Sequence, residues 1–442
     1  MHINFEQIYQ LAQQWDQEDP LRSFRNEFYL PQKSDGTPKI YFCGNSLGLQ
    51  PKLVDKYVGE ELHRWATLGV EGHFKGNPAW FNYHRILQEP TAKLVGALPH
   101  EVVIMNTLTV NLHLMMISFY RPTAKRYKIL MESSAFPSDQ YAVESQVKLH
   151  GFDPETAIVE VAPRSGEFTL RMEDIQQTIY KHADSLALVL FGGVHYYTGQ
   201  WFNLAQIVEA AHQVGAYAGF DLAHAVGNVP LQLHAWGVDF AVWCSYKYLN
   251  SGPGGTSGVF VHERHASKQE LPRLAGWWGY KEETRFLMKK GFEPMQGAQG
   301  WQLSCGQILP FAAHRAALEI FQRAGMERLR AKSVKLTGFL ANLIQALNQQ
   351  AGQELLRIIT PADPEQRGCQ LSVMVKHNGK QVFNQLLEAG VVCDWREPDV
   401  IRLAPVPLYN TFEEVAQFAY ILGRILNLVT KSTIFFRFAF FN

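Results

Sequence analysis

Two short apolar segments of the sequence each end in residues that could do chemistry. Residues 216–220 and 240–244 are bounded by turn signals and have the length of buried strands. Asp221 and His224 follow the first segment, and Lys247 follows the second. Pyridoxal phosphate (PLP) chemistry needs such a pair, because the lysine forms a Schiff base with the aldehyde and the acid pairs with the pyridinium nitrogen. The pattern therefore predicts a PLP site.

Each of these residues also has an ordinary structural interpretation. A single lysine after a strand is commonly a solvated loop residue, and a single aspartate there is commonly a helix N-cap. Asp221 and His224 could suggest a metal site, but no further ligands accompany them, so no metal is expected. The PLP interpretation depends on the pair together with the Gly/Pro-rich turn that follows Lys247.

Two further segments place polar residues at the start of a helical pattern. Thr107 or Thr109 can cap a helix whose free N–H groups could bind a phosphate, although most such caps bind nothing. Phe136 could stack on a planar ring, with Ser138 or Asp139 hydrogen-bonded to it, although an aromatic residue before proline is more often packing.

Apolar runs alternate with helical segments from about residue 86 onward. This alternation predicts a mostly parallel sheet covered by helices on both faces. Its expected strands are 102–105, 127–131, 157–162, 186–192, 216–220, 240–244 and 258–262. Ligands of such sheets bind at the carboxyl ends of the strands, where Asp221, His224 and Lys247 fall.

The length of 442 residues predicts two domains. We expect an N-terminal segment, 1–60, that packs near the small domain, a large PLP-binding domain at 61–320, and a small α+β domain at 321–442. Helical periodicity from 311 to about 349 bridges the two domains, and the small domain has expected strands at 356–360, 369–375, 391–395 and 400–405. The apolar run 433–442 matches neither a strand nor a membrane span.

Composition excludes several function classes. Lys+Arg and Asp+Glu both total 41, and no basic run is present, so no nucleic-acid partner is expected. No apolar run reaches the ~18 residues of a membrane span, and the N-terminus is too polar for a signal peptide. The five cysteines are scattered without a CxxC spacing, which favours a reducing cytoplasm over disulfides or structural zinc. A nicotinamide dehydrogenase or a GxSxG hydrolase is not supported, because neither motif occurs.

Several stretches together carry a resemblance to a known family: GNSLGLQP, LTVNLHL, AFPSD, YYTGQ, DLAHAVGN, SYKYLNSGPGG, GWWG and IRLAPVPLYN. They run from about residue 40 to 410, and the chain resembles the kynureninases, PLP enzymes of the aspartate-aminotransferase-like fold (fold type I). The resemblance implies an α/β fold with a large PLP-binding domain, a smaller α+β C-terminal domain, and a homodimer with active sites at the interface.

The resemblance also implies a reaction and the residues that carry it. The reaction is the hydrolytic Cβ–Cγ cleavage of L-kynurenine or 3-hydroxy-L-kynurenine to an anthranilate and L-alanine, in tryptophan catabolism and NAD biosynthesis. Lys247 would bind the cofactor and remove the Cα proton, and Asp221, supported by His224, would keep the pyridine nitrogen protonated. Tyr246 would serve in proton transfer at the reacting carbonyl.

The remaining implied roles concern binding. The implied cofactor contacts are Leu108, Thr109, Tyr246 and Trp277 at the phosphate, and Phe136, Pro137, Ser138 and Asp139 around the ring. Arg402 would bind the substrate α-carboxylate, because the planar guanidinium can bind a carboxylate through two N–H groups and lysine cannot. His73 would face the aromatic ring of the substrate.

Two departures from the family pattern keep other functions open. Cys305 follows GWQLS where the family usually has Asn or Thr, and Gly192 stands where some members have Ser. A thiol is a weaker hydrogen-bonding group, so substrate preference is the property we expect to differ. The alternatives are a PLP enzyme of the same fold acting on another aryl-ketone or β-substituted amino acid, and a catalytically silent scaffold protein.

Overall fold

The computed structural model describes residues 3–266, 268 and 271–429 of the chain. The apolar run 433–442 lies outside the described residues. Within the described part, no helix is long and apolar enough to cross a membrane.

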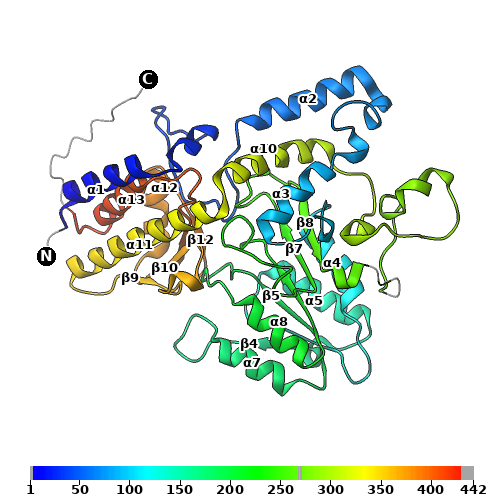
Figure 1. The fold of residues 1–442 in the computed structure, drawn as a ribbon. Helices are drawn as coiled ribbons and strands as arrows, with labels where there is room; N and C mark the ends of the chain where they lie inside the picture. The colour runs from blue at the N-terminus through cyan, green and yellow to red at the C-terminus, as the bar shows by residue number, and fades with distance from the viewer. Residues whose placement is uncertain (1–2, 267, 269–270, 430–442) are drawn as a thin grey trace.

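The helices alternate with the strands along most of the chain (Figure 1). The helices are α1 (Phe5–Glu18), α2 (Leu53–Leu68), α3 (Arg85–Val95), α4 (Leu108–Phe119), α5 (Pro137–Leu149), α6 (Pro154–Ala157), α7 (Met172–Lys181), α8 (Leu204–Gln213), α9 (Glu263–Ala266), α10 (Ile308–Ala324), α11 (Met326–Ala351), α12 (Gly379–Glu388) and α13 (Phe412–Ile425). The strands are β1 (Ile40–Tyr41), β2 (Val102–Met105), β3 (Lys128–Glu132), β4 (Ile158–Val161), β5 (Leu186–Gly192), β6 (Tyr217–Asp221), β7 (Phe240–Cys244), β8 (Ser257–Val261), β9 (Leu356–Ile358), β10 (Leu371–Val375), β11 (Val391–Val392), β12 (Asp394–Arg396) and β13 (Val400–Leu403).

The central sheet has seven strands in the order β2-β8-β7-β6-β5-β3-β4. β8 pairs antiparallel with both of its neighbours, and the other pairings are parallel. This arrangement confirms the predicted α/β fold with a mostly parallel sheet. The predicted strand 216–220 is shifted by one residue, since β6 runs from Tyr217 to Asp221 and the acid is itself the last residue of the strand.

Alternate residues of the strands supply two hydrophobic cores, one on each face of the sheet. Val103, Ile129 and Val242 pack with buried residues of α4 and α5. Phe220 and Trp243 face the other side and pack with α3, α8 and α10. Because side chains alternate along a strand, a central strand with both faces covered is apolar throughout, as β7 is.

A glycine at the centre of the sheet allows β6 and β7 to pair closely. Gly219 lies opposite Phe240 in the register, and a Cβ at Gly219 would lie 2.0 Å from the Phe240 ring. The aromatic ring therefore occupies the space that a side chain on β6 would need. This packing holds the two strands whose ends carry Asp221 and Lys247.

The C-terminal part of the chain forms a second sheet and core. β12-β13-β10-β9 form an antiparallel sheet, and β1 pairs in parallel with β11. Figure 1 shows α1 beside α13, and Phe5 and Ala12 of α1 belong to the same core as α11 and α13. Two predicted elements are divided: a left-handed Gly325 separates α10 from α11, and the strand expected at 391–395 is β11 followed by β12.

Candidate active site

A cavity of about 200 Å³ opens at the carboxyl ends of the strands β3, β5 and β6. Nine of the residues predicted from the sequence line it: Leu108, Thr109, Phe136, Ser138, Asp139, Asp221, His224, Tyr246 and Lys247. The two groups on which the PLP interpretation depends, the Lys247 amine and the Asp221 carboxyl, therefore face one cavity.

The Lys247 amine lies close to a buried histidine. Its Nζ is 3.0 Å from His224 Nε2 and 5.7 Å from the centre of the Phe136 ring. Burial, and then the charge of Lys247, lower the pKa of His224 well below its ordinary value, so the imidazole is neutral. A neutral imidazole that accepts at Nε2 carries its proton on Nδ1, and this buried atom has no hydrogen-bond partner among the described residues. His224, predicted to support Asp221, contacts Lys247 in the structure.

Asp221 is a buried acid that accepts hydrogen bonds from its neighbours. Its Oδ1 accepts a 2.7 Å hydrogen bond from the Ala223 N–H. Burial raises the pKa of Asp221, while the Ala223 N–H, the Lys247 charge and Asp139 lower it. Burial and then the charge of Asp221 raise the pKa of Asp139 well above its ordinary value, so Asp139 stays protonated and its O–H donates a hydrogen bond to Asp221. Asp221 is therefore the acid that carries the negative charge of this pair.

The opposite part of the cavity is formed by the starts of two helices. α4 begins at Leu108 and α5 at Pro137, the predicted ring contact, which does not itself line the cavity. Thr109 Oγ1 and Ser138 Oγ, one from each helix, lie 2.8 Å apart and form a hydrogen bond. The first N–H groups of an α-helix have no partner within the helix, so this corner suits a phosphate.

Arg402 lies behind the cavity wall and not in it. Its side chain is 1% exposed, and it donates a 2.8 Å hydrogen bond to the Tyr196 carbonyl oxygen and further bonds to Ser46 Oγ and Asp394. Tyr196 lines the cavity and its ring meets Phe136 edge-on at 5.2 Å. Arg402 Nε is buried without a hydrogen-bond partner among the described residues. The guanidinium is thus fixed one residue away from the cavity, with one N–H group unused.

Two other predicted residues lie apart from the cavity. The His73 ring packs against Trp80 at 5.4 Å, and Trp277 is 45% exposed and meets Phe286 at 5.4 Å. Neither residue lines the cavity. Cys305 is exposed, whereas Gly192 does line the cavity.

Glu132 and Tyr196 also line the cavity, and neither was predicted from the sequence as a site residue. Glu132 is the last residue of β3, so the strand-end rule that selected Asp221 could also have selected it. Its Oε1 accepts a 2.9 Å hydrogen bond from the Gly192 N–H. Burial, and then the charge of Asp221, raise the pKa of Glu132 to about 8, so the acid is neutral near pH 7.

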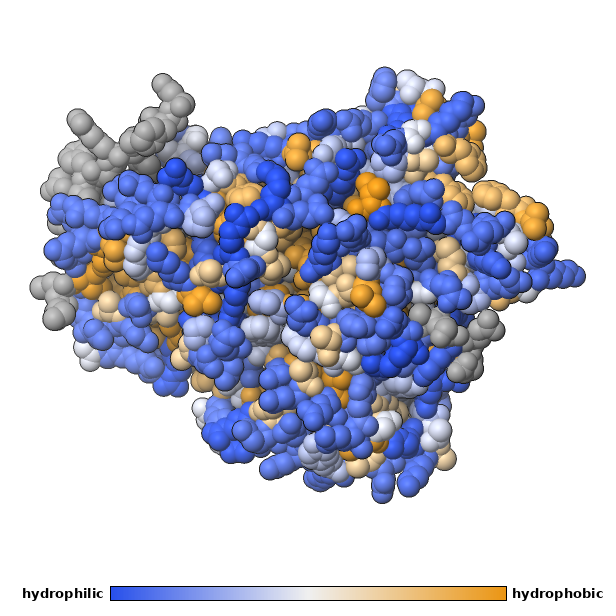
Figure 2. Space-filling view, viewed as in Figure 1, coloured by the Kyte–Doolittle hydropathy of each residue, from blue (hydrophilic) through white to orange (hydrophobic). Residues whose placement is uncertain are grey.

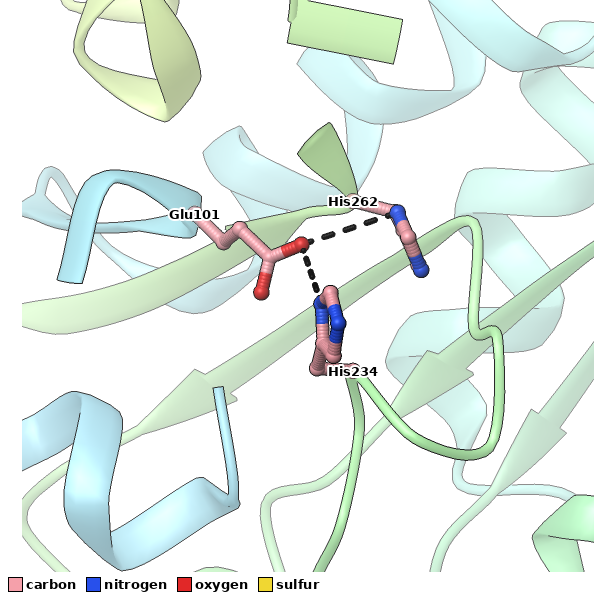
Figure 3. Close-up of side chains that lie close together, drawn as sticks. All are labelled: Glu101, His234 and His262. Atoms are coloured by element: carbon pink, nitrogen blue, oxygen red, sulfur yellow. Dashed lines mark hydrogen bonds and ion pairs between the residues drawn. The ribbon is translucent and has the colours of Figure 1, made fainter. Parts of the chain in front are cut away.

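A second cluster of titratable groups lies outside the cavity and joins two strands (Figure 3). His234 Nδ1 and His262 Nδ1 lie 3.0 and 3.6 Å from Glu101 Oε1, and the two imidazole rings stack at 4.9 Å. The Glu101 carboxylate also accepts hydrogen bonds from the N–H groups of Glu263 and Leu98. These contacts account for the cluster as a structural link between the start of β2 and the end of β8.

Solved structures with the same architecture define the class of the fold. A cysteine desulfurase from Thermococcus onnurineus NA1 matches with a TM-score of 0.73 and 16% identity, over 88% of this chain and 95% of that chain. A C-DES variant with glycine covalently linked to its PLP cofactor matches with a TM-score of 0.72 and 16% identity, over 87% of this chain and 96% of that chain. The chain has the PLP fold type I architecture.

Sequence relatives place the chain within that class. It is 54% identical over 414 residues to a kynureninase from Koribacter versatilis, covering 94% of this chain and 97% of the relative. A kynureninase from Myxococcus xanthus is also 54% identical over 414 residues, covering 94% of this chain and 96% of the relative. The model of the kynureninase C-terminal domain matches residues 329–422. The chain belongs to the kynureninase family.

Glu132→Gln is expected to flatten the pH dependence of stability of the protein without cofactor. The pKa of Glu132 is raised from 4.5 to about 8, so as the pH rises the unfolded chain loses this proton first and the free energy of unfolding falls across that window. One such group gives a slope of up to about 1.4 kcal/mol per pH unit. Denaturant unfolding at several pH values measures the slope. Glu388→Gln on α12, where the side chain is exposed and distant in sequence from the cavity residues, is the control. An equal slope in wild type and Glu132→Gln would contradict the prediction.

Proposed function

We propose that the chain is a kynureninase that binds PLP and hydrolyses the Cβ–Cγ bond of L-kynurenine or 3-hydroxy-L-kynurenine, giving an anthranilate and L-alanine. One observation carries the proposal: the Lys247 amine and the Asp221 carboxyl line a single cavity. This cavity belongs to a chain that is 54% identical to relatives named kynureninase.

The side chains of the cavity fit the parts of PLP. Lys247 supplies the amine for the aldehyde, and Asp221 supplies a buried carboxylate for the pyridine nitrogen. The Phe136 ring supplies an apolar face, and the free N–H groups of α4 with Ser138 suit the phosphate. His224 Nδ1, buried and without a partner among the described residues, adds a donor for a polar atom of the cofactor.

When bound, PLP accepts the electron pair that is released at the substrate Cα. Lys247 moves the proton at Cα, since its amine is the basic group beside His224. Burial raises the pKa of Tyr246, which keeps the phenol protonated and able to donate to the γ-carbonyl oxygen of the substrate. Arg402 contacts the cavity residue Tyr196 and has one N–H group, at Nε, without a partner among the described residues. We propose that this group binds the α-carboxylate beside Tyr196 and so fixes the orientation of Cα and the carbonyl.

The alternatives differ in what they predict for turnover. A PLP enzyme for another aryl-ketone or β-substituted amino acid would bind the cofactor without cleaving kynurenine, and a silent scaffold would do neither. The high identity to the kynureninases over almost the whole chain favours cleavage of kynurenine.

We also propose that the enzyme acts in the cytoplasm, in tryptophan catabolism and NAD biosynthesis. We propose further that the chain divides into an N-terminal segment, 1–60, a large domain, 61–320, and a small domain, 321–442.

A homodimer is proposed because aromatic side chains gather on one exposed surface. Phe74, Phe81, Phe286 and Trp277 contact one another in a chain of ring contacts at 5.4–6.2 Å. Phe74, Trp277 and Phe286 are 64%, 45% and 51% exposed. Figure 2 shows apolar residues at the end of the molecule where α2 ends in Figure 1. Exposed apolar patches of this kind mark protein interfaces. We propose that a second copy covers this surface and that Trp277 reaches the partner's cavity.

Kynurenine turnover tests the proposed activity. The PLP-loaded protein is expected to release fluorescent anthranilate and an equal amount of alanine from L-kynurenine, and Lys247→Ala is expected to lower kcat by at least about a thousandfold because the mobile base is lost. A parallel assay with 3-hydroxykynurenine gives the substrate preference. PLP absorbance without either product would contradict the proposal and support the alternative substrate class.

Arg402→Lys tests the carboxylate site. The expected result is a KM for kynurenine raised about tenfold or more with a smaller change in kcat, because lysine cannot replace the planar fork held by Tyr196 and Asp394. Arg396→Lys is the matched control, since Arg396 also pairs with Asp394 but is more exposed. Unchanged KM in Arg402→Lys would place the carboxylate elsewhere.

Sedimentation velocity tests the dimer. The apparent mass of the PLP-loaded protein from sedimentation is expected to be twice the chain mass of 50.2 kDa. Phe286→Glu is expected to shift it toward the monomer, because a charge would be buried at the aromatic surface. Leu149→Glu, at a separate position that is 71% exposed, is expected to leave the dimer intact. A monomeric wild-type protein would contradict the proposal.

A further inference from the structure

Glu132 is a buried acid of the cavity that the proposed reaction leaves without a role. It is 4% exposed and ends β3, whereas Asp221 ends β6, and β5 lies between these strands. Its Oε1 accepts the Gly192 N–H, and its Oε2 is buried with no hydrogen-bond partner among the described residues. A buried polar atom that faces a ligand cavity without a partner is a candidate for a contact made when the cavity is filled.

Gly192 makes the position of this carboxyl possible. It is the last residue of β5, and it lies directly opposite Asp221 in the register of β5 and β6. A Cβ at Gly192 would lie 2.9 Å from Glu132 Oε1, closer than Cβ atoms approach other atoms. The missing side chain therefore leaves room for the Glu132 carboxyl to lie across the end of β5, between β3 and β6. The space that the Glu132 carboxyl needs is a physical reason for glycine at position 192, where some members of the family have serine.

The charges around Glu132 require it to be neutral. The acids near it are Asp221 on β6, Asp139 on α5 and Glu160 on β4, and Lys247 is the cation of the cavity. Two or three carboxylates cannot all be ionised in one buried site beside one amine without a large cost. The pKa of Glu132 at about 8 agrees with a protonated acid at pH 7. Because Oε1 accepts the Gly192 N–H, the proton belongs on Oε2.

We propose that Glu132 is a positioning residue for the cofactor end held by Asp221: as a neutral acid, it donates a hydrogen bond from Oε2 into the cavity and leaves Asp221 as the anion that faces the pyridine nitrogen. Gly192 serves this role by leaving space for the Glu132 carboxyl. The inference rests on the proposed function, since it requires that the cavity binds PLP.

The test compares four variants by PLP binding and by the absorbance of the bound cofactor. Glu132→Ala removes the donor and leaves the Gly192 N–H without its acceptor, and it is expected to raise the PLP dissociation constant about tenfold or more. Gly192→Ala displaces the Glu132 carboxyl and is expected to raise the PLP dissociation constant to a similar extent. The double variant is expected to bind PLP no more weakly than Glu132→Ala does, because the two substitutions remove the same interaction. Glu132→Gln keeps a neutral donor and acceptor, and its dissociation constant is expected to stay within about threefold of wild type.

The pH dependence separates this role from a structural one. Titration of the wild-type cofactor absorbance is expected to show a pH transition that reports the ionisation of Glu132, and Glu132→Gln is expected to lack it. Gly338→Ala is the control for the glycine variant, because its Cβ meets no atom within 4 Å on helix α11. Thermal unfolding of each variant without cofactor checks that it folds, and Glu132→Gln provides the titration test even if Glu132→Ala does not fold.

The outcomes distinguish the two proposals. Wild-type PLP affinity in both Glu132→Ala and Gly192→Ala, or an unchanged transition in Glu132→Gln, would overturn the role of Glu132 while leaving the proposed function in place. Additive losses in the double variant would overturn the steric role of Gly192. A wild-type protein that does not bind PLP at all would overturn the proposed function itself.

Discussion

The parallel pairing of β5, β6 and β7 is the constraint on which the site depends. Parallel strands end at the same edge of a sheet, so the residues that end or follow them meet in one place. Asp221 ends β6 opposite Gly192 of β5, and Lys247 follows β7 by three residues. The Phe240 ring over Gly219 keeps β6 and β7 together beneath this edge. The amine and the acid thus lie in one cavity because the backbones of these strands pair directly beneath it.

Burial sets the charges at this edge. Removing several acids from water raises their pKa values, and the hydrogen bonds then decide which acid stays ionised. Asp221 receives the Ala223 N–H and faces Lys247, while Asp139 and Glu132 keep their protons. The same burial makes His224 neutral beside the lysine. The cavity thus presents one carboxylate, one amine and several neutral donors, which is the distribution that an aromatic aldehyde with a basic ring nitrogen and a phosphate requires.

The sequence predicted well those features that depend on strand position. Asp221 and Lys247 follow from apolar runs of strand length, and the mostly parallel sheet follows from the alternation of strands and helices. Features that depend on packing between distant segments could not be read in this way. The contact of His224 with Lys247, the Arg402 network and the space above Gly192 each need the folded backbone. The division of a helical run at Gly325 was missed, because apolar periodicity continues through the break.

The most direct test of the account is to reduce the PLP-loaded protein with borohydride and to map the labelled peptide by mass spectrometry. One pyridoxyl group per chain is expected, attached to Lys247, and no label is expected in Lys247→Ala. Label on another lysine, or no label at all on a protein that has bound PLP, would contradict the assignment of Lys247 as the lysine that binds PLP.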